Sequence, residues 1–407
     1  MTDRARVVII GGSLAGLTAA LLLRDAGCDV HVFERTAVTL EGRGAGIVLH
    51  PRTVQYLVEN APSSLDGISV SARWFRYLGG DGGALHEEPC RYRFTSYTSI
   101  YHPLRMLLDA DRYHVGEEAV DFEQDDDGVA VRFATGRVER CDMLVCADGI
   151  NSAGRRWLVP DATPGYAGYI AWRGTLGEQE LSARSREALQ EAIAYYVSTA
   201  PGQGEHVLAY PIPGPAIASG GPPLSNWLWY RNMDVAARDE LLVDRAGNQL
   251  VASVPPGSVQ DRFLEELRAD ASERLPAPLV ETLLRTAQPF VQVIFDVGVE
   301  RMAFGRTCLI GDAAFAVRPH VAAGAAKGAD DAWALADAMR ACGNDVPTAL
   351  ACWEPGQLAL GQHVLERARG AGDSVQFDGT WSPGAPLPFG LRRRGDGSLS
   401  DLVTTAR

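Results

Sequence analysis

The N-terminal part of the chain alternates short apolar runs with a segment whose apolar residues recur at helical spacing. Residues 7–10 form an uninterrupted apolar run, which is typical of a parallel strand buried on both faces. Residues 17–24 carry apolar positions with helical period, and Gly27 follows as a residue that commonly closes a helix. Residues 30–33 form a second apolar run. This order predicts a strand–helix–strand unit of the kind that opens a parallel sheet.

A glycine-rich turn joins the first strand to the helix. It contains Gly11, Gly12, Ser13 and Gly16, and Glu34 stands at the end of the second strand. The helix N-terminus offers free N–H groups to a pyrophosphate, and the carboxylate can accept hydrogen bonds from the adenosine ribose. Ser13 replaces the middle glycine of the usual Gly-x-Gly-x-x-Gly pattern, but serine still lets the backbone approach the phosphate. The surrounding elements favour a dinucleotide site over a plain glycine turn.

Apolar patterning also divides the rest of the chain. Aromatic strand candidates at residues 168–172, 207–212 and 227–230 are separated by loops rich in Pro and Gly, which predicts an antiparallel sheet in a second domain. We also expect strands at residues 44–49, 143–147, 290–297 and 307–310, hairpins at 68–90 and 119–133, and helices at 51–59, 103–108, 259–274, 278–287, 321–340 and 348–369.

Composition narrows the classes of protein that are compatible with this pattern. The chain has 407 residues, of which 46% are hydrophobic and 22% are charged, as expected for a soluble two-domain protein. Its net charge of −13 argues against nucleic acid as a partner, and no apolar run is long enough for a membrane span. The seven cysteines show no C-x-x-C spacing, so we expect buried thiols in a reducing cytoplasm and no metal site.

Two later motifs also stand at strand ends. Asp148 and Gly149 follow one apolar run and precede Arg155, while Gly311 and Asp312 follow another. The carboxylate of Asp312, in the second motif, can accept a hydrogen bond from a polyol hydroxyl. The helix after it would point its N-terminus back toward the same place, where its dipole favours an anionic ring.

The order of these motifs resembles the FAD-binding set of the class A flavoprotein monooxygenases, the para-hydroxybenzoate hydroxylase-like family. The segments GYIAWRG, YPIPG, RPHVAAGAAKGADDA and PFGL are similar to segments of the bacterial 2,6-dihydroxypyridine 3-hydroxylases. The similarity covers nearly the whole chain.

The resemblance implies an α/β fold in which a Rossmann-like FAD-binding domain carries an inserted antiparallel-sheet substrate domain and a C-terminal helical segment. It places the FAD-binding domain at residues 1–72, 97–165 and 290–345. The substrate domain is expected at 73–96 and 166–289, with a C-terminal helix and tail at 346–407.

The same resemblance implies the activity. FAD is the expected cofactor and NADH or NADPH the expected co-substrate. O₂ would hydroxylate a small electron-rich pyridine or phenol through a flavin C4a-hydroperoxide, with 2,6-dihydroxypyridine as the first choice of substrate. The residues that this resemblance assigns to the FAD site are Gly11, Ser13, Leu14, Ala15, Gly16, Glu34, Arg35, Asp148, Arg155, Asp312, Pro319, Ala322, Ala323, Gly324, Ala325 and Ala326.

Catalytic side chains are harder to identify because the redox chemistry belongs to the cofactor. A group that takes or stabilises the proton of the substrate hydroxyl would help, and His50, Tyr210 and His320 are the candidates. His50 has an alternative as a helix-start histidine facing solvent, and Tyr210 as ordinary core. Arg173 could hold a substrate oxyanion, although a structural ion pair is favoured. Trp227, Trp229 and Tyr230 could form the wall of a pocket or pack in the core, and both alternatives stay open.

Other functions fit less well. A flavin halogenase usually carries Trp-x-Trp-x-Ile-Pro, whereas the Trp-Leu-Trp at residues 227–229 continues into Tyr-Arg-Asn. A flavin-binding redox sensor without turnover would be expected to carry an additional partner domain, and none is visible. A hydroxylase of another phenolic or heteroaromatic metabolite stays open. The second-domain sheet could support a homodimer.

Overall fold

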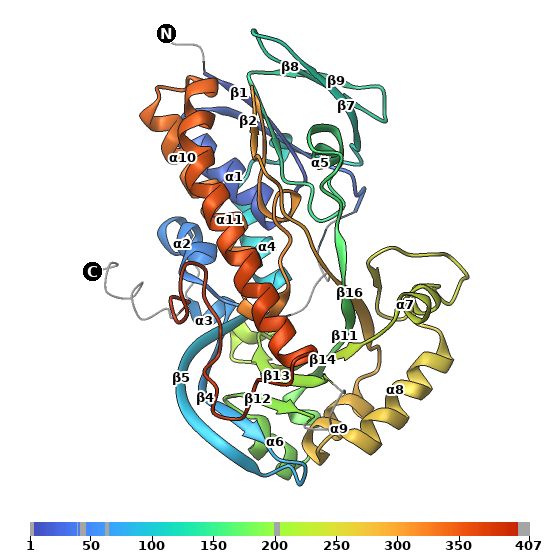
Figure 1. Ribbon diagram of the computed structural model, residues 1–407. Coiled ribbons are helices and arrows are strands. Elements are labelled where there is room, and N and C mark those ends of the chain that lie inside the picture. Colours follow the sequence, from blue (N-terminus) through green and yellow to red (C-terminus); the bar gives the residue numbers. More distant parts are fainter. Residues whose placement is uncertain (1–3, 39, 41–45, 62–64, 199–203, 398–407) are drawn as a thin grey trace.

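The computed structural model describes residues 4–38, 40, 46–61, 65–198 and 204–397. The strands of this part of the chain form three sheets of six, nine and three strands. Figure 1 shows an elongated molecule with the six-stranded sheet and its helices at one end and the large sheet at the other.

The six-stranded sheet is the predicted dinucleotide-binding unit. Its strand order is β17 (Ala303–Phe304), β18 (Thr307–Leu309), β10 (Met143–Cys146), β1 (Arg6–Ile10), β2 (Asp29–Glu34) and β6 (Tyr113–Val115). All neighbours are parallel except β17 and β18, and the side chains of β10 are buried on both faces. Helices α1 (Leu14–Asp25) and α10 (Gly324–Ala341) pack against each other beside this sheet. The βαβ prediction is confirmed, while β6 was not expected.

The nine-stranded sheet forms the second unit. Its order is β15 (Ser253–Val254), β16 (Phe290–Asp296), β11 (Gly165–Gly177), β14 (Leu224–Asn232), β13 (His206–Ile212), β12 (Ala192–Val197), β4 (Val70–Leu78), β5 (Ala84–Ser96) and β3 (Gly46–Val48). The predicted antiparallel pairing holds except between β12 and β4, which run parallel. These two strands come from distant chain segments, so no hairpin turn imposes the antiparallel direction.

Two strands join a different sheet from the one that the expected domain division implied, while the division itself stays a prediction. Residues 46–48 and 290–296 were assigned to the FAD-binding domain, but β3 pairs with β5, and β16 pairs with β11 in the large sheet. An apolar run predicts a strand but does not say which sheet it joins, since that depends on distant partners. Part of the strand expected at 44–49 lies outside the described residues.

Capping explains where the predicted helix starts were wrong. Helix α4 (Tyr97–Met106) starts six residues before Pro103, because the Ser96 hydroxyl accepts the Ser99 N–H at 3.1 Å and caps it. Helix α10 starts at Gly324, not at 321, because Ala322 adopts a left-handed conformation (φ +53°) after the short helix η5 (Pro319–Val321).

The remaining helices surround the two sheets, and α11 is the longest. They are α2 (Pro51–Asn60), α3 (Leu65–Ile68), α5 (Ala153–Leu158), α6 (Ala183–Leu189), α7 (Val235–Leu241), α8 (Asp261–Arg274), α9 (Ala277–Arg285) and α11 (Val346–Gln376). In Figure 1, α11 runs along the molecule from the first unit to the second. The predicted hairpin at 119–133 is present as β7 (Ala119–Gln124) and β8 (Val129–Phe133), and β9 (Val138–Cys141) completes that sheet. None of the described helices has the length and hydropathy of a membrane span.

Candidate active site

A cleft of about 290 Å³ lies where β1 and β2 end. Gly11, Ser13, Glu34, Arg35 and Asp148, all predicted for the FAD site, line it. Gly11 adopts φ +99°, and a Cβ there would overlap the carbonyl group of Ala147 on the neighbouring strand end. The turn therefore needs glycine for two reasons, its backbone angle and the close approach of a second strand.

Main-chain N–H groups fix the carboxylate of Glu34 in this cleft. Its Oε2 accepts the N–H of Gly12 at 2.9 Å, and its Oε1 accepts the N–H of Thr36 at 2.9 Å. The side chain is buried. A carboxylate held this way keeps lone pairs directed at the cleft, where a ribose diol can donate to them.

The N-terminus of α1 completes the cleft. Ser13 is the N-cap residue, yet its side chain forms no capping bond within the described chain; its hydroxyl is 2.9 Å from the Tyr97 hydroxyl instead. The N–H groups of the first turn have no partner inside the helix, so they are available to a bound diphosphate. The residues present therefore fit the ADP half of FAD.

Asp148 and Arg155 act mainly on the protein itself. Asp148 accepts the Ser152 hydroxyl at 2.5 Å and the Ala153 N–H at 2.6 Å, which orders the start of α5. The guanidinium of Arg155 is buried and donates to the carbonyl oxygens of Ala162 at 3.0 Å and Ala313 at 2.9 Å. Arg155 therefore braces the segment at residues 311–313.

A larger cavity of about 540 Å³ adjoins the cleft, and Ser13, Ala147 and Gly149 line both. Asp312 reaches into this larger cavity from the short helix η4 (Gly311–Ala313). The side chain of Asp312 is accessible from the cavity, but the protein around it keeps it from bulk water. This desolvation raises the pKa of Asp312 to about 6. The carboxyl group is placed to bind a polyol such as the ribityl chain.

Most of the FAD-site residues predicted between 319 and 326, here named the predicted flavin loop, border this cavity, as do two residues of α1. In these two segments, the predicted residues that line the cavity are Leu14, Ala15, Pro319, Ala322, Ala323, Gly324 and Ala325. Three residues predicted for the FAD site line neither cavity, namely Gly16, Ala326 and the Arg155 described above. Ala326 is buried in an apolar cluster with Val364 and Ala368 of α11, and a Cβ at Gly16 would overlap the Gly11 carbonyl oxygen. Both serve packing because each faces away from the cavity.

Of the three catalytic candidates, Tyr210 and His320 line the cavity and His50 does not. His50 caps α2, where its Nδ1 accepts the Arg52 N–H at 3.1 Å. Its Nε2 lies 3.5 Å from Asp396. The helix-start alternative was correct for His50, although the side chain is buried rather than exposed to solvent. The Tyr210 hydroxyl donates to the Gly46 carbonyl at 3.0 Å, and burial raises its pKa.

His320 belongs to a cluster of rings that sequence reasoning only partly identified. Its Nε2 is 2.7 Å from the Tyr169 hydroxyl, and its ring centroid lies 5.2 Å from those of His206 and Tyr230. His206 stacks on Tyr230 at 4.5 Å, and neither of its ring nitrogens has a hydrogen-bond partner among the described residues. His206 was missed because a single histidine that begins an apolar strand gives no local signal.

Both imidazoles are neutral near pH 7. Burial, with a smaller effect of Arg318, lowers the pKa of His320 to about 3. Burial and the neighbouring His320 hold the pKa of His206 well below its usual range. Neutral imidazole both donates and accepts hydrogen bonds, so the pair can accept a hydrogen bond from a hydroxyl of a bound ring, while pKa values this low disfavour the uptake of its proton.

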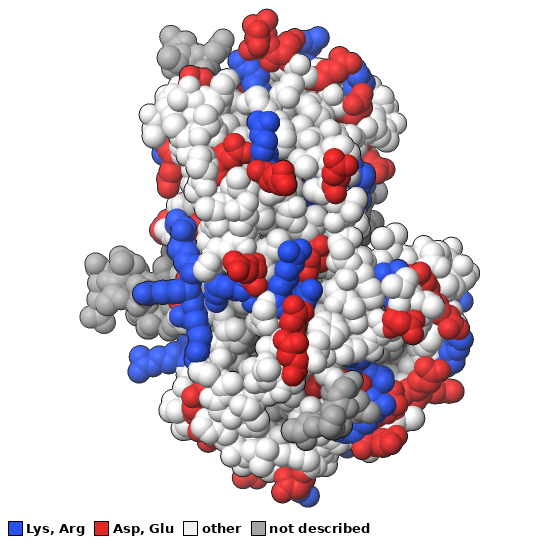
Figure 2. Space-filling view, in the orientation of Figure 1, with Lys and Arg blue, Asp and Glu red and all other residues white. Residues whose placement is uncertain are grey.

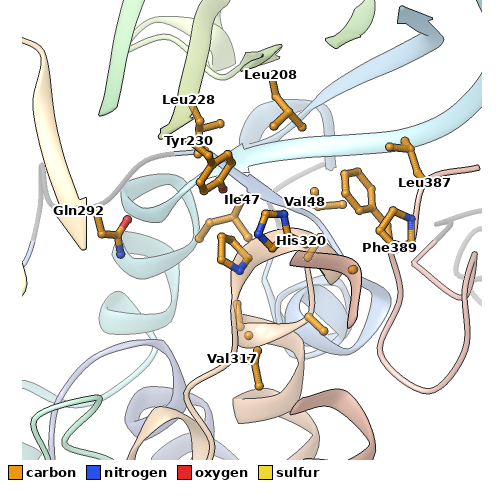
Figure 3. Close-up of a pocket in the computed structure, with 18 of the residues that line it drawn as sticks. Ile47, Val48, Leu208, Leu228, Tyr230, Gln292, Val317, His320, Leu387 and Phe389 are labelled. Atoms are coloured by element: carbon orange, nitrogen blue, oxygen red, sulfur yellow. The ribbon is translucent and has the colours of Figure 1, made fainter. Parts of the chain in front are cut away.

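Arg173 and Gln292 supply polar groups elsewhere in the wall. The Arg173 Nη1 donates to the Gln292 Oε1 at 2.5 Å, while its buried Nε has no partner among the described residues. Figure 3 shows Gln292 on one side of the cavity, Leu387 and Phe389 on the other, and His320 between them. Trp227 and Trp229 are core residues of the second unit, whereas Tyr230 lines the cavity.

A turn that can receive a phosphate, a carboxylate that can accept from a ribose and an adjoining aromatic-lined cavity fit a dinucleotide-dependent enzyme that acts on a small ring-shaped molecule. Two family models described as "FAD binding domain" and "FAD binding domain-like" match residues 4–64 and 166–296. The 2,6-dihydroxypyridine 3-monooxygenase of Paenarthrobacter nicotinovorans is 38% identical over 389 residues, which are 95% of this chain and 96% of that protein.

Solved structures agree with this similarity. The 2,6-dihydroxypyridine-3-hydroxylase from Arthrobacter nicotinovorans superposes with a TM-score of 0.90 at 37% identity, covering 96% of this chain and 98% of that chain. The HpxO protein of Klebsiella pneumoniae, solved with FAD and uric acid, has the same fold (TM-score 0.74, 19% identity, 93% of this chain and 91% of that chain). The chain belongs to the family of FAD-dependent aromatic monooxygenases. FAD is its cofactor, NAD(P)H is the co-substrate typical of the family, and the expected fold and enzyme class are confirmed.

Proposed function

We propose that this enzyme hydroxylates a small hydroxylated pyridine, with 2,6-dihydroxypyridine as its substrate and carbon 3 as the position attacked. The observation that carries the proposal is the cavity beside the predicted flavin loop, where His206, His320 and Tyr230 meet. Its volume of about 540 Å³ has to admit both the flavin ring and the substrate, which favours a single-ring molecule. The 2,6-dihydroxypyridine 3-monooxygenase described above is similar to this chain over nearly its full length.

When bound, FAD supplies the hydride acceptor for NAD(P)H and the activation of O₂. Gly11, Ser13, Leu14, Ala15, Glu34 and Arg35 hold its ADP half in this proposal, and Asp312 with the loop at residues 319–325 holds the remainder. The shared lining of the two cavities supports this path. Asp148, Gly16, Arg155 and Ala326 support the site through packing or backbone hydrogen bonds.

The protein activates the substrate ring through its hydroxyl groups. An aromatic ring becomes more nucleophilic as a hydroxyl loses its proton. The unprotonated ring nitrogen of His206 has no partner among the described residues and can accept a hydrogen bond from that hydroxyl, and His320, held by Tyr169, lies beside it. Arg173 can stabilise the oxyanion that forms, since its Nε has no other partner among the described residues. Tyr210 positions the wall through its bond to Gly46.

Exclusion of water protects this chemistry from wasteful release of hydrogen peroxide. The side chains of Leu208, Leu228 and Val317 contribute apolar surface to the cavity. These residues come from β13, β14 and the approach to η5, so the wall forms only after both units have assembled.

The test is a turnover assay on the FAD-loaded enzyme. NADH and NADPH oxidation would be followed in air with and without 2,6-dihydroxypyridine, and the product would be weighed by mass spectrometry. We expect stimulated oxidation and a product that is heavier by one oxygen atom. Stimulated oxidation that yields only hydrogen peroxide would overturn the substrate assignment. A panel of other phenols and heteroaromatic rings would then identify the true substrate, and no turnover with any of them would favour a redox sensor.

The finer expectations on assembly and location are also part of this proposal. A homodimer is testable by light scattering. The cysteines of the described residues are free thiols, which supports a cytoplasmic enzyme, and fractionation of the source cells tests it.

A further inference from the structure

The chain returns to the cavity after the end of α11. Residues 381–391, here named the C-terminal strap, contain no helix or strand. Figure 1 shows the dark red segment leaving the lower end of α11, passing β4 and β5, and turning back toward α2. Six residues of this strap line the 540 Å³ cavity: Trp381, Ala385, Pro386, Leu387, Pro388 and Phe389.

Fixed elements hold the backbone of the strap. The guanidinium of Arg367 on α11 donates to the carbonyl oxygens of Pro388 at 2.9 Å, Gly390 at 3.0 Å and Leu391 at 3.1 Å. The Tyr77 hydroxyl on β4 donates to the Ala385 carbonyl at 2.6 Å. An irregular segment with this many backbone hydrogen bonds presents its side chains in one arrangement.

A turn after the strap anchors its C-terminal end. The carboxylate of Asp396 accepts the backbone N–H groups of Leu391 at 2.7 Å, Arg392 at 2.7 Å and Arg393 at 3.0 Å. Burial alone would raise the pKa of Asp396, but these N–H groups and His50 hold it below its usual range. His50, once a catalytic candidate, is therefore a neighbour of this anchor.

An ion pair connects the same turn to the FAD-binding unit. Arg392 donates to the fully buried Asp330 of α10 at 2.7 Å, and Arg52 of α2 donates to the same carboxylate group at 2.8 Å. In Figure 2, basic side chains gather at the height where Figure 1 places α2 and the end of the strap. Residues 392–394 are three exposed arginines, and the first of them, Arg392, therefore has a structural partner in Asp330.

Two of the strap side chains that line the cavity, Leu387 and Phe389, are large and buried. Leu387 and Phe389 belong to the same apolar cluster as Leu208 and Leu228, which also line the cavity. Phe389 packs edge-on against Tyr92 with ring centroids 5.4 Å apart. Truncating either residue would enlarge the cavity, because the backbone bonds prevent the strap from collapsing inward.

We propose that the C-terminal strap selects the size of the substrate, with Leu387 and Phe389 limiting the cavity to a single ring. This proposal deepens the proposed function and rests on it for the chemical class of the substrate. It assigns specificity to a segment that no strand or glycine motif predicts.

The test compares binding of two ligands to the FAD-loaded enzyme. Dissociation constants for 2,6-dihydroxypyridine and for the bicyclic 2,4-dihydroxyquinoline would be measured from the change in flavin absorbance. Leu387→Ala with Phe389→Ala should shift the ratio of the two constants at least about tenfold toward the bicyclic ring. Leu387→Trp should shift binding the other way and weaken binding of the pyridine.

Leu391→Ala is the matched control. Leu391 belongs to the same strap and is buried, but it packs with Val321, Leu360 and Val364 and does not line the cavity. Its truncation should lower the midpoint of thermal unfolding and leave the binding ratio unchanged. An unchanged ratio in the double variant, or an equal shift in Leu391→Ala, would overturn the proposal. If the double variant does not bind FAD, Leu387→Trp alone decides.

Binding separates this proposal from the proposed function. If the wild-type enzyme binds the pyridine but does not hydroxylate it, the proposed substrate is wrong while the ratio still tests the strap. If hydroxylation occurs and the ratio does not move, the strap alone is excluded as the selecting element.

Discussion

The two adjoining cavities of this enzyme are made from different kinds of groups. Main-chain N–H groups, a glycine turn and the carboxylate of Glu34 form the predicted part of the 290 Å³ cleft, and they all lie within residues 11–36. Side chains from β11, β13 and β14, a loop before α10 and the C-terminal strap make the 540 Å³ cavity. A backbone-made site is constrained by the fold, whereas a side-chain-made site can change its ligand while the fold persists. Four predictions sharpen this contrast.

The largest effect is expected at the backbone-made cleft. Gly11→Ala should abolish FAD binding, since the new Cβ would overlap the Ala147 carbonyl and the φ of +99° disfavours alanine. Flavin absorbance after purification and FAD titration measure this loss. Gly27→Ala is the control, because Gly27 has φ +94° but a Cβ added there would meet no atom within 4 Å. It should cost only about 1 kcal/mol of stability. Equal losses in both variants would show that strain, and not the close approach, matters.

The second effect concerns the histidine cluster. His320→Gln should lower kcat by about 10²-fold or more with the proposed substrate, because a hydrogen-bonded partner of the substrate site is lost. FAD affinity should stay within about threefold, since the cleft does not depend on this ring. Stopped-flow reduction and product analysis separate the steps. A variant that loses FAD instead would place His320 in the cofactor site. His50→Gln serves as the comparison and should keep kcat.

A third, smaller effect is expected at the ribose-binding carboxylate. Glu34→Gln keeps one oxygen acceptor but turns an N–H₂ group toward a backbone N–H, either that of Gly12 or that of Thr36. An unmatched buried donor costs about 1–3 kcal/mol, so FAD should bind about 10- to 100-fold more weakly. Fluorescence quenching of FAD measures the constant. Glu118→Gln, at another position in the same cleft, should leave it nearly unchanged.

The effect that is smallest near neutral pH is a change in stability that develops only in acid. His206 and His320 are held neutral in the folded state, the latter with a pKa of about 3, whereas histidine in the unfolded chain binds a proton below about 6.5. The unfolded state therefore binds more protons below pH 6.5, so stability falls as the pH falls toward 3. For His320 this increases the loss of unfolding free energy by roughly 1.4 kcal/mol per pH unit in that window, and His206 acts in the same direction. Urea unfolding of the double variant His206→Gln/His320→Gln should show a shallower decline; an equal slope would contradict the burial argument.

The same contrast explains how much could be predicted from the sequence. The βαβ unit and its glycine turn were predicted because a local period and a fixed spacing encode them. His206 and the strap were not, since their place in the cavity depends on strands and an ion pair from distant parts of the chain. The sheet that β3 and β16 join could not be predicted for the same reason. His50 was misassigned because capping and catalysis both use a histidine at a helix start.

Because the segments of the two units are interleaved along the chain, the order of synthesis affects how the enzyme folds. In the parallel sheet β1 takes β10 as a neighbour, 136 residues later, and β10 pairs with β18 only after residue 307 has been made. Contacts so far apart in the chain form slowly, and on a ribosome the first strand leaves the tunnel long before its partners exist. The parallel sheet that carries the cofactor cleft is therefore completed only late in synthesis. Free FAD that captures it would shift the balance from the unfolded to the folded chain by mass action, so flavin supply would set the yield of protein as well as its activity.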